Sequence, residues 1–130
     1  MSELKRKDLI YPELCYKVIG MLFVVWKELG SGHKEKLYQN AISEEFKNAN
    51  LQFKKELPVN IVYKNKKIGM YYFDFLIEDK LVLETKVRNY FSKKDIQQLH
   101  SYLKVQHLKL GLIAHFTQSG VKFKRVVNLI

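Results

Sequence analysis

The fold is decided by the stretch Met70-Tyr71-Tyr72-Phe73-Asp74-Phe75-Leu76-Ile77 and, after three residues, Leu81-Val82-Leu83-Glu84-Thr85-Lys86. Both runs are apolar and rich in aromatic and β-branched residues, which indicates two strands joined by a turn at Glu78-Asp79-Lys80. A loop of three residues pairs Ile77 with Leu81. Counting outward from that pair predicts that Asp74 lies directly opposite Glu84 on one face of an antiparallel hairpin. A loop of two or four residues would place these two side chains on opposite faces.

The paired acids and a nearby lysine form the first candidate site. Two carboxylates about 5 Å apart repel each other unless a cation lies between them. Mg²⁺ prefers oxygen ligands and usually keeps waters for the phosphates of its substrate. Lys86 lies on the same face as Glu84, opposite Tyr72, and could hold an attacking water or offset charge in a transition state. The alternative is that Glu84 and Lys86 face solvent and that Asp74 is a charge on an edge strand.

Two helices are predicted before the hairpin, after which the period of apolar residues changes from 3.6 to 2. Pro12 suits the first position of a helix that stops at Gly30-Ser31-Gly32, and a second helix is predicted over residues 34–49. The inward residues of that second helix are Tyr38, Ala41, Ile42, Phe46 and Ala49. Extended segments are predicted near 52–56, 59–64, 68–77 and 81–87, with a loop at Asn65-Lys66-Lys67.

A third helix and two closing strands are predicted after the hairpin. Ser92, with Asp95 three residues on, is typical of a helix cap, and this helix ends near Val105. Strands at 110–116 and 121–129 flank a turn at Gln118-Ser119-Gly120. The third helix joins two strands that could lie parallel through a right-handed crossover. The order of elements predicts an α/β (α+β) fold with a mixed sheet and helices packed on it.

Glu35 is a third candidate carboxylate, because it shares the apolar face of the second predicted helix with Tyr38 and Ile42. A carboxylate on a buried face near a helix start should be paired, hydrogen-bonded or bound to metal. With Gly32 as N-cap, Glu35 falls at the third helical position, where its carboxylate can reach back to the cap's N–H. The sequence leaves both roles open, and one residue could perform both.

Gln98 and Tyr102 lie four residues apart and share a face of the third predicted helix. Gln98 could contact a phosphate or a metal-bound water, while Tyr102 could stack or donate a hydrogen bond. A polar rim beside the core is the simpler interpretation of this spacing. The four histidines show no metal-ligand spacing, so packing or surface roles are predicted for them.

The length and the absence of a linker or internal repeat indicate one domain over residues 1–130, and a cytoplasmic location is expected from the cysteine count and the apolar runs. Lys plus Arg number 23 against 13 Asp plus Glu, and the formal charge of +10 favours nucleic acid or anionic lipid as partner. A basic surface without such a partner is the alternative.

The lone Cys15 fits a reducing compartment and is expected to be a buried thiol. The longest apolar run, 18–26, is shorter than the ~20 residues that cross a bilayer, so no membrane partner is expected.

Four motifs in this order resemble a known family over residues 9 to 127. The segment Gly32-His33-Lys34-Glu35-Lys36-Leu37-Tyr38 matches the pattern that names the GxxExxY proteins, a group within the PD-(D/E)XK nuclease-like superfamily. Asp74 and then Glu84-Thr85-Lys86 match the superfamily's Asp and Glu-x-Lys positions. Gln98 and Tyr102 match the Gln-x-x-x-Tyr element of its RecB-like branch. Ser31 stands where the family often has proline, and Trp26 where it often has histidine.

The resemblance implies a restriction-endonuclease-like core of αβββαβ form and a phosphodiesterase site that depends on Mg²⁺ or Mn²⁺. By that likeness the metal is held by Asp74, Glu84 and the backbone carbonyl of Thr85, with Glu35 as a further ligand. Lys86 is then the catalytic lysine. The expected function is a nuclease acting on DNA, or on RNA, in repair or in defence against foreign DNA. A nucleic-acid-binding module without turnover and a protein-interaction subunit are the alternatives, and a homodimer stays open.

Overall fold

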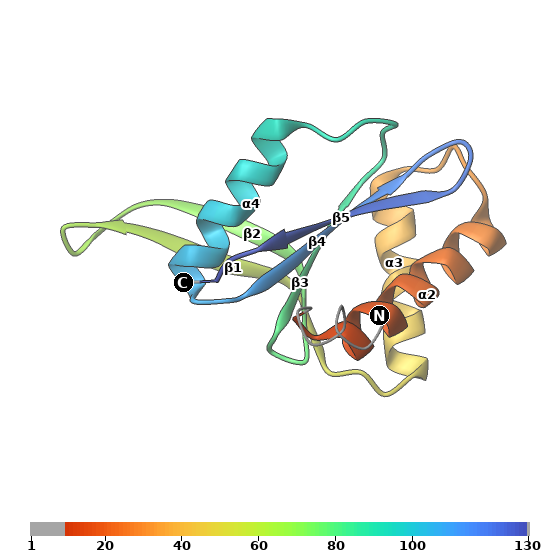
Figure 1. The fold of residues 1–130 in the computed structure, drawn as a ribbon, viewed down its shortest axis with the longest axis horizontal. Helices are drawn as coiled ribbons and strands as arrows, with labels where there is room; N and C mark the ends of the chain where they lie inside the picture. Colours follow the sequence, from red (N-terminus) through yellow and green to blue (C-terminus); the bar gives the residue numbers. More distant parts are fainter. Residues whose placement is uncertain (1–9, 130) are drawn as a thin grey trace, which may run out of the picture.

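The computed structural model describes residues 10–129, which form one five-stranded sheet packed against helices (Figure 1). The helices are α2 (Pro12–Leu29), α3 (Glu35–Asn48) and α4 (Lys93–Gln106). The strands, in their order across the sheet, are β1 (Phe53–Tyr63), β2 (Lys66–Ile77), β3 (Leu81–Lys86), β4 (Leu110–Phe116) and β5 (Val121–Val127). β3 and β4 are parallel and the other neighbours are antiparallel, so the predicted mixed sheet and αβββαβ order are confirmed.

The two N-terminal helices begin and end largely where the sequence indicates. α2 starts at Pro12, whose missing N–H costs nothing in the first turn, and it ends at Gly30. α3 has Lys34 as its N-cap, with an extended backbone at φ −70° and ψ 151°. Glu35 is therefore the first helical residue and not the third, so the predicted cap by Gly32 is wrong. Within residues 10–129 no helix is long and apolar enough to cross a membrane.

The sheet carries a hydrophobic core on each face. The core under α2 and α3 includes Cys15, Leu22, Tyr38, Ile42, Phe46 and Phe75. The core under α4 includes Val59, Phe73, Val82, Leu99 and Leu103. Three of the residues predicted to face inward on α3, Tyr38, Ile42 and Phe46, are fully buried, and burial of Cys15 is likewise confirmed.

β1 is one long strand, whereas the sequence predicted two segments at 52–56 and 59–64. The predicted loop at 65–67 is shorter too, because Lys64 and Asn65 both have positive φ, at 48° and 65°. Two consecutive residues with positive φ make a tight turn whose twist matches that of a β-hairpin. β2 can therefore begin at Lys66, and the β1–β2 hairpin is longer than predicted.

The β1–β2 hairpin changes face at Asp74. Glu56, the residue opposite it, has a φ of 54°, and these two residues are absent from the pairing that continues on both sides. Phe75 packs in the core under α2 and α3, whereas Phe73 packs in the core under α4. Strict alternation would place both phenylalanines on one face. The interruption therefore reorients the side chains at the position of the first candidate carboxylate.

β2 and β3 pair over only three residues each and then separate. The ladder joins Ile77 with Leu81, Leu76 with Val82, and Phe75 with Leu83, which confirms the predicted three-residue loop. Beyond this ladder β2 continues along β1, while β3 continues along β4. The two strands form a fork, and its apex lies at Asp74 and Glu84.

α4 connects β3 to β4 and packs tightly against β4. Its cap is as predicted, with the Ser92 hydroxyl accepting a hydrogen bond from the N–H of Asp95 at 3.4 Å. Gly111 of β4 permits the close packing, because a Cβ there would lie 2.8 Å from Cδ2 of Leu99. This contact sets how closely α4 approaches the sheet next to the fork.

Candidate active site

Asp74 and Glu84 each bond to the opposing strand at the apex of the fork. The N–H of Asp74 donates to the Glu84 carboxylate at 2.8 Å, and the Asp74 carboxylate accepts from the N–H of Thr85 at 2.8 Å. These side chains replace the backbone ladder, which ends one pair earlier. The two acids are therefore neighbours, joined through the backbones of β2 and β3.

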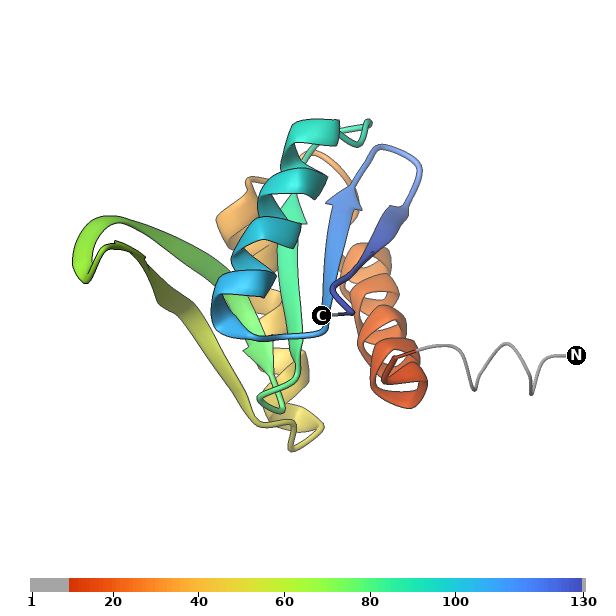
Figure 2. The same cartoon turned by 60° about the vertical axis from the view of Figure 1, so that its left-hand side comes forward.

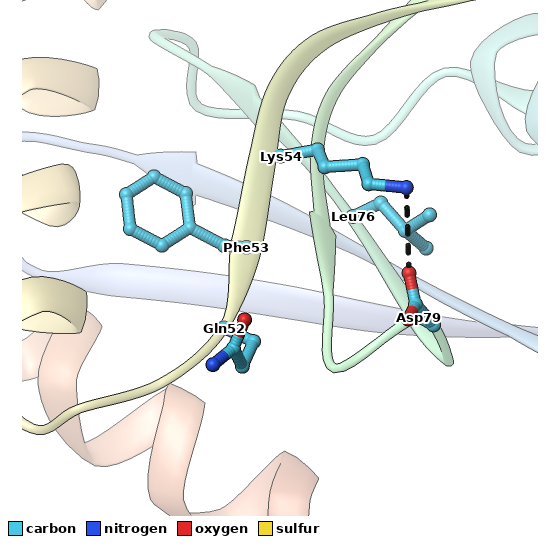
Figure 3. Close-up of a pocket in the computed structure, with 5 residues that line it drawn as sticks. All are labelled: Gln52, Phe53, Lys54, Leu76 and Asp79. Atoms are coloured by element: carbon cyan, nitrogen blue, oxygen red, sulfur yellow. Dashed lines mark ion pairs between the residues drawn. The ribbon is translucent and has the colours of Figure 1, made fainter.

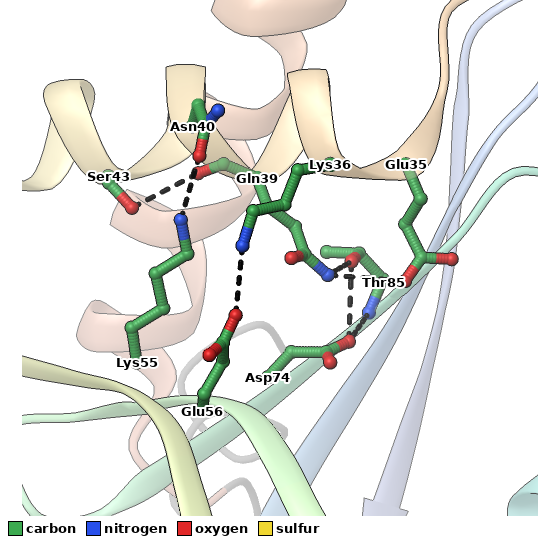
Figure 4. A network of polar contacts seen from close by, with 9 residues as sticks. All are labelled: Glu35, Lys36, Gln39, Asn40, Ser43, Lys55, Glu56, Asp74 and Thr85. Carbon is green, nitrogen blue, oxygen red and sulfur yellow. Dashed lines mark hydrogen bonds and ion pairs between the residues drawn. The ribbon is translucent and has the colours of Figure 1, made fainter.

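The two carboxylates differ in their other contacts, which lie toward α3 for Asp74 and toward α4 for Glu84, whereas the sequence predicted that both side chains share one face. Oδ2 of Asp74 lies 3.3 Å from the hydroxyl of Thr85, on the side of α3 (Figure 4). Glu84 instead accepts a hydrogen bond of 2.5 Å from the hydroxyl of Tyr71. The ring of Tyr71 stacks on Tyr102 of α4, with centroids 4.0 Å apart. The interruption of β1–β2 pairing at Asp74 accounts for the difference.

Gln39 connects the fork to α3. Its side-chain amide donates to Oγ1 of Thr85 at 2.8 Å and to Oε2 of Glu35 at 3.2 Å (Figure 4). Because Gln39 is buried, this one amide holds both partners in place. The sequence analysis missed Gln39, although its four-residue spacing from Glu35 places both on one side of a helix.

Two further bridges tie α3 to β1 beside the fork (Figure 4). Lys36 Nζ lies 2.9 Å from Oε1 of Glu56, the residue opposite Asp74. Lys55 donates to Asn40 at 2.9 Å. Both bridges are exposed, so they orient the helix more than they stabilise it.

On the α4 side, a small cavity brings together three of the predicted site residues. Glu84 and Lys86 come from β3 and Gln98 from α4, and the remaining lining residues are Tyr71, Asp95, Leu99 and Ile113. Asp95 is held by an ion pair with Arg88 at 2.8 Å. Tyr102 is not a lining residue, and its contact with the site is the stack on Tyr71.

The three carboxyl groups in and beside the fork, those of Asp74, Glu84 and Glu35, have raised pKa values. Burial, and then the charge of Asp74, raise the pKa of Glu84 to about 7, against the hydrogen bond from Tyr71. Burial also raises the pKa of Asp74, opposed by the hydrogen bond from the N–H of Thr85. The pKa of Glu35 is raised by partial burial of its carboxyl and by Asp74. Lys86 therefore offsets only part of the negative charge gathered here, and a further cation would be favourable.

Comparison with known proteins agrees with this geometry. Residues 12–126 match the family model described as the PD-(D/E)XK nuclease superfamily. The chain belongs to this superfamily. Among solved structures, the chain is similar to the crystal structure of SSO0001, with a TM-score of 0.55 and 16% sequence identity. A comparison with curated proteins gave no match.

The likeness to SSO0001 concerns the fold. It covers 73% of this chain and 51% of that one, so the chain spans about half the length of SSO0001. Together with the PD-(D/E)XK family match, it agrees with the predicted restriction-endonuclease-like fold. The superfamily part of the predicted resemblance is confirmed.

PD-(D/E)XK nucleases typically use Mg²⁺ or Mn²⁺. The carboxylates of Asp74 and Glu84 are the type of ligand that such an ion prefers. Within residues 10–129 no three His, Cys, Asp or Glu side chains are grouped closely enough to cage a metal. Mg²⁺ needs no such cage, because one or two carboxylates hold it and water and substrate phosphates complete its shell. Asp74 and Glu84 supply two carboxylates whose repulsion a divalent ion would relieve. Glu35 lies close enough to Asp74 for that charge to raise its pKa, and the amide of Gln39 joins it to Thr85.

His115 lies beside the candidate site of this PD-(D/E)XK chain, and the spacing of histidines did not single it out. It is paired in the sheet with Lys86 of β3 and Lys122 of β5. The side chain is fully buried, and neither ring nitrogen has a hydrogen-bond partner among residues 10–129. Its ring stacks on Phe91 at 4.0 Å. Burial, and then the charge of Arg88, lower the pKa of His115 to about 4, so the imidazole is neutral at pH 7.

A separate hollow lies beside the β2–β3 turn (Figure 3). It is lined by Gln52, Phe53, Lys54, Leu76 and Asp79. Its two charges face each other, with Lys54 Nζ 3.7 Å from Oδ1 of Asp79, and both side chains are exposed. This hollow contains none of the residues of the PD-(D/E)XK motif, so the fork is the better candidate for catalysis.

Proposed function

We propose that the protein is a metal-dependent nuclease that hydrolyses phosphodiester bonds of DNA, and that it belongs to the GxxExxY group in the RecB-like branch. The observation that carries this proposal is the juxtaposition of Asp74, Glu84 and Lys86 at the fork. A protein that only bound nucleic acid would not need two neighbouring carboxylates, whose charges raise the local pKa values and repel the phosphate backbone.

Asp74 and Glu84 would hold Mg²⁺ or Mn²⁺ in this proposal. A bound divalent ion polarises a phosphoryl oxygen and lowers the pKa of its water. Thr85, fixed by Gln39, holds the Asp74 carboxylate through its N–H, and Tyr71 holds the Glu84 carboxylate through its hydroxyl. The backbone and hydroxyl contacts thus orient both acids before substrate binds.

Lys86 and Gln98 would act on the substrate from the α4 side. Both line the same small cavity as Glu84. The ammonium of Lys86 can hold the attacking water or offset negative charge as it develops on the phosphate. The amide of Gln98, exposed on α4, can donate to a phosphate oxygen. Tyr102 supports Tyr71 by stacking and so acts as a positioning residue.

The test compares cleavage of single-stranded DNA, double-stranded DNA and RNA in Mg²⁺ by the parent, Lys86→Ala and Glu84→Ala. Both variants should lose cleavage and keep binding to DNA in Ca²⁺, which shows that they are folded. Lys17→Ala, on the exposed side of α2, is the matched control and should cleave like the parent. Equal cleavage by all four proteins would mean contamination or another site and would overturn the assignment.

We further propose a cytoplasmic protein with residues 1–130 as a single domain. The one cysteine agrees with this location, because a chain with a single cysteine, Cys15, cannot form an internal disulfide, and such bonds are typical of proteins from oxidising compartments. A homodimer is compatible with the proposal and is tested with the β1–β2 hairpin below.

A further inference from the structure

The outer part of the β1–β2 hairpin, residues 57–73, projects from the sheet as a two-stranded arm (Figures 1 and 2). Its strands pair with each other, whereas β2 pairs with β3 only from Phe75 to Ile77. An isolated pair of strands is marginally stable in water. The arm must therefore gain stability from what covers its two faces.

One face of the arm is covered at its base. Val59 and Phe73 are fully buried in the core under α4, and Leu57, Ile61 and Tyr71 pack against that core. This packing fixes the direction in which the arm leaves the sheet. Tyr71 also bonds to Glu84, so the arm and the candidate active site share one rigid contact.

The other face of the arm is open and apolar. Ile68, Met70 and Tyr72 alternate along β2 with the residues that face α4, so they share the uncovered face. Their side chains are 65%, 41% and 55% exposed. Near the tip, where neither face of the arm is covered, Val62 and Tyr63 are each 59% exposed. Such a cluster of exposed apolar side chains on one element is typical of an interaction surface.

The charge of the arm indicates what it contacts. Between Leu57 and Phe73 the chain has three lysines, Lys64, Lys66 and Lys67, and no Asp, Glu or Arg. All three lysines are exposed at or beside the turn. Edge strands often carry lysine to prevent strand pairing, but that role would not require an apolar broad face. Lysines next to exposed aromatic and aliphatic groups match a polyanion whose grooves also offer apolar contacts, such as thymine methyl groups.

We infer that the arm grips duplex DNA on one side of the cleavage position, an inference that rests on the proposed nuclease function. A two-stranded β-ribbon fits the major groove of B-DNA, and the lysines at its tip would lie against the phosphates that border the groove. Tyr72, Met70 and Ile68 would then contact base edges and thymine methyl groups. These three lysines give the arm a net positive charge within a chain whose formal charge is +10.

The length of the arm predicts how much duplex it needs. From Asp74 to Lys66 the strand rises eight residues, or roughly 26 Å at about 3.3 Å per residue. At 3.4 Å per base pair, this reach corresponds to about 8 base pairs. Duplex beyond the cleavage position should therefore strengthen binding up to about 8 base pairs and add little after that.

The test measures binding in Ca²⁺ to DNA hairpins with stems of about 5 and about 20 base pairs, at several salt concentrations. The variant Lys64→Gln/Lys66→Gln/Lys67→Gln should bind the long stem about 10- to 100-fold more weakly at physiological salt. Its salt slope should fall by about one per lysine. The control Lys17→Gln/Lys27→Gln/Lys47→Gln removes the same charge from α2 and α3 and should retain most of the slope.

On the short stem, the arm variant and its control should bind equally, because the tip has no duplex to reach. Equal affinity of the two variants for the long stem would overturn the inference. A change in oligomeric state in the arm variant, with unchanged DNA binding, would instead assign the arm to contact with a second copy of the chain. Loss of cleavage in Lys86→Ala tests the nuclease function separately, since that variant should keep the arm-dependent binding. If the parent binds through the arm but cleaves none of these DNAs, only the nuclease function fails.

Discussion

The N–H of Asp74 donates a hydrogen bond of 2.8 Å to the carboxylate of Glu84, across the gap where β2 and β3 separate. This bond ties the position of one candidate metal ligand to the backbone that carries the other. It favours the ionised form of Glu84, but burial and the charge of Asp74 oppose it and raise the pKa of Glu84 to about 7. The fork therefore holds negative charge that the neighbouring side chains only partly compensate.

Asp74→Asn should raise the melting temperature in EDTA at pH 8. The variant keeps an oxygen that can accept from the N–H of Thr85, and it removes the charge that repels Glu84. Mg²⁺ should stabilise the parent and stabilise the variant much less, because a ligand stabilises in proportion to its affinity for the native state. Thermal melts with EDTA and with Mg²⁺ measure both effects.

Asp79→Asn is the matched control for this experiment. Asp79 is exposed at the β2–β3 turn beside Lys54, so its loss removes the same charge outside the fork. Its Mg²⁺ shift should equal that of the parent. A parent that Mg²⁺ does not stabilise, together with a destabilised Asp74→Asn, would contradict the metal site.

Gly111→Ala should destabilise the protein by about 1–3 kcal/mol, because overpacking a buried contact forces neighbouring side chains to move. The new Cβ would lie 2.8 Å from Cδ2 of Leu99, which is itself 1% exposed. Gly20→Ala is the control, since that glycine lies within α2 with no other atom near the added Cβ. It should stabilise the protein by about 0.5–1 kcal/mol. Urea unfolding of both variants measures the two changes in the free energy of unfolding. Equal changes would contradict the packing of α4 on β4.

The sequence predicted the fold well because its main signals are local. The three-residue loop after Ile77 set the register of the β2–β3 hairpin, and Pro12 and Ser92 marked helix starts. The prediction failed where regular strand alternation was assumed beyond the hairpin. The count through Asp74 assumed regular alternation, but the pairing with Glu56 is interrupted there, so the further contacts of Asp74 lie toward α3 and those of Glu84 toward α4.

The supporting residues of the candidate site were harder to predict than its acids. By alternation, Tyr71 and Asp74 should face opposite ways, so a hydrogen bond from Tyr71 to Glu84 had no sequence signal. Gln39 had a signal in its spacing from Glu35, but its bond to Thr85 spans 46 residues and depends on the tertiary fold. His115 was visible as a lone polar residue in an apolar strand. Its position beside Lys86 follows only from the parallel register of β3 and β4.

Glu84 and His115 should give opposite pH dependences to the stability of the metal-free protein. The pKa of Glu84 is raised from 4.5 to about 7, so the native state holds a proton that the unfolded state has released. The contribution of Glu84 to the free energy of unfolding is therefore complete below pH 4.5 and is lost as the pH rises through 7. The pKa of His115 is lowered from 6.5 to about 4. Its contribution is present above pH 6.5 and is lost as the pH falls through 4.

The two pH windows overlap between pH 4.5 and 6.5. The two groups therefore give slopes of opposite sign in the parent, and single variants should reveal each slope in EDTA. Glu84→Gln keeps partners for Tyr71 and the N–H of Asp74, and its stability should rise with pH relative to the parent. His115→Leu removes a buried ring without hydrogen bonds, so its stability should fall with pH relative to the parent. Urea unfolding from pH 4 to 8 measures how the free energy of unfolding changes with pH. The double variant should show a pH dependence close to that of the parent. A strongly destabilised His115→Leu at pH 7 would instead show that the imidazole has a partner in the native protein.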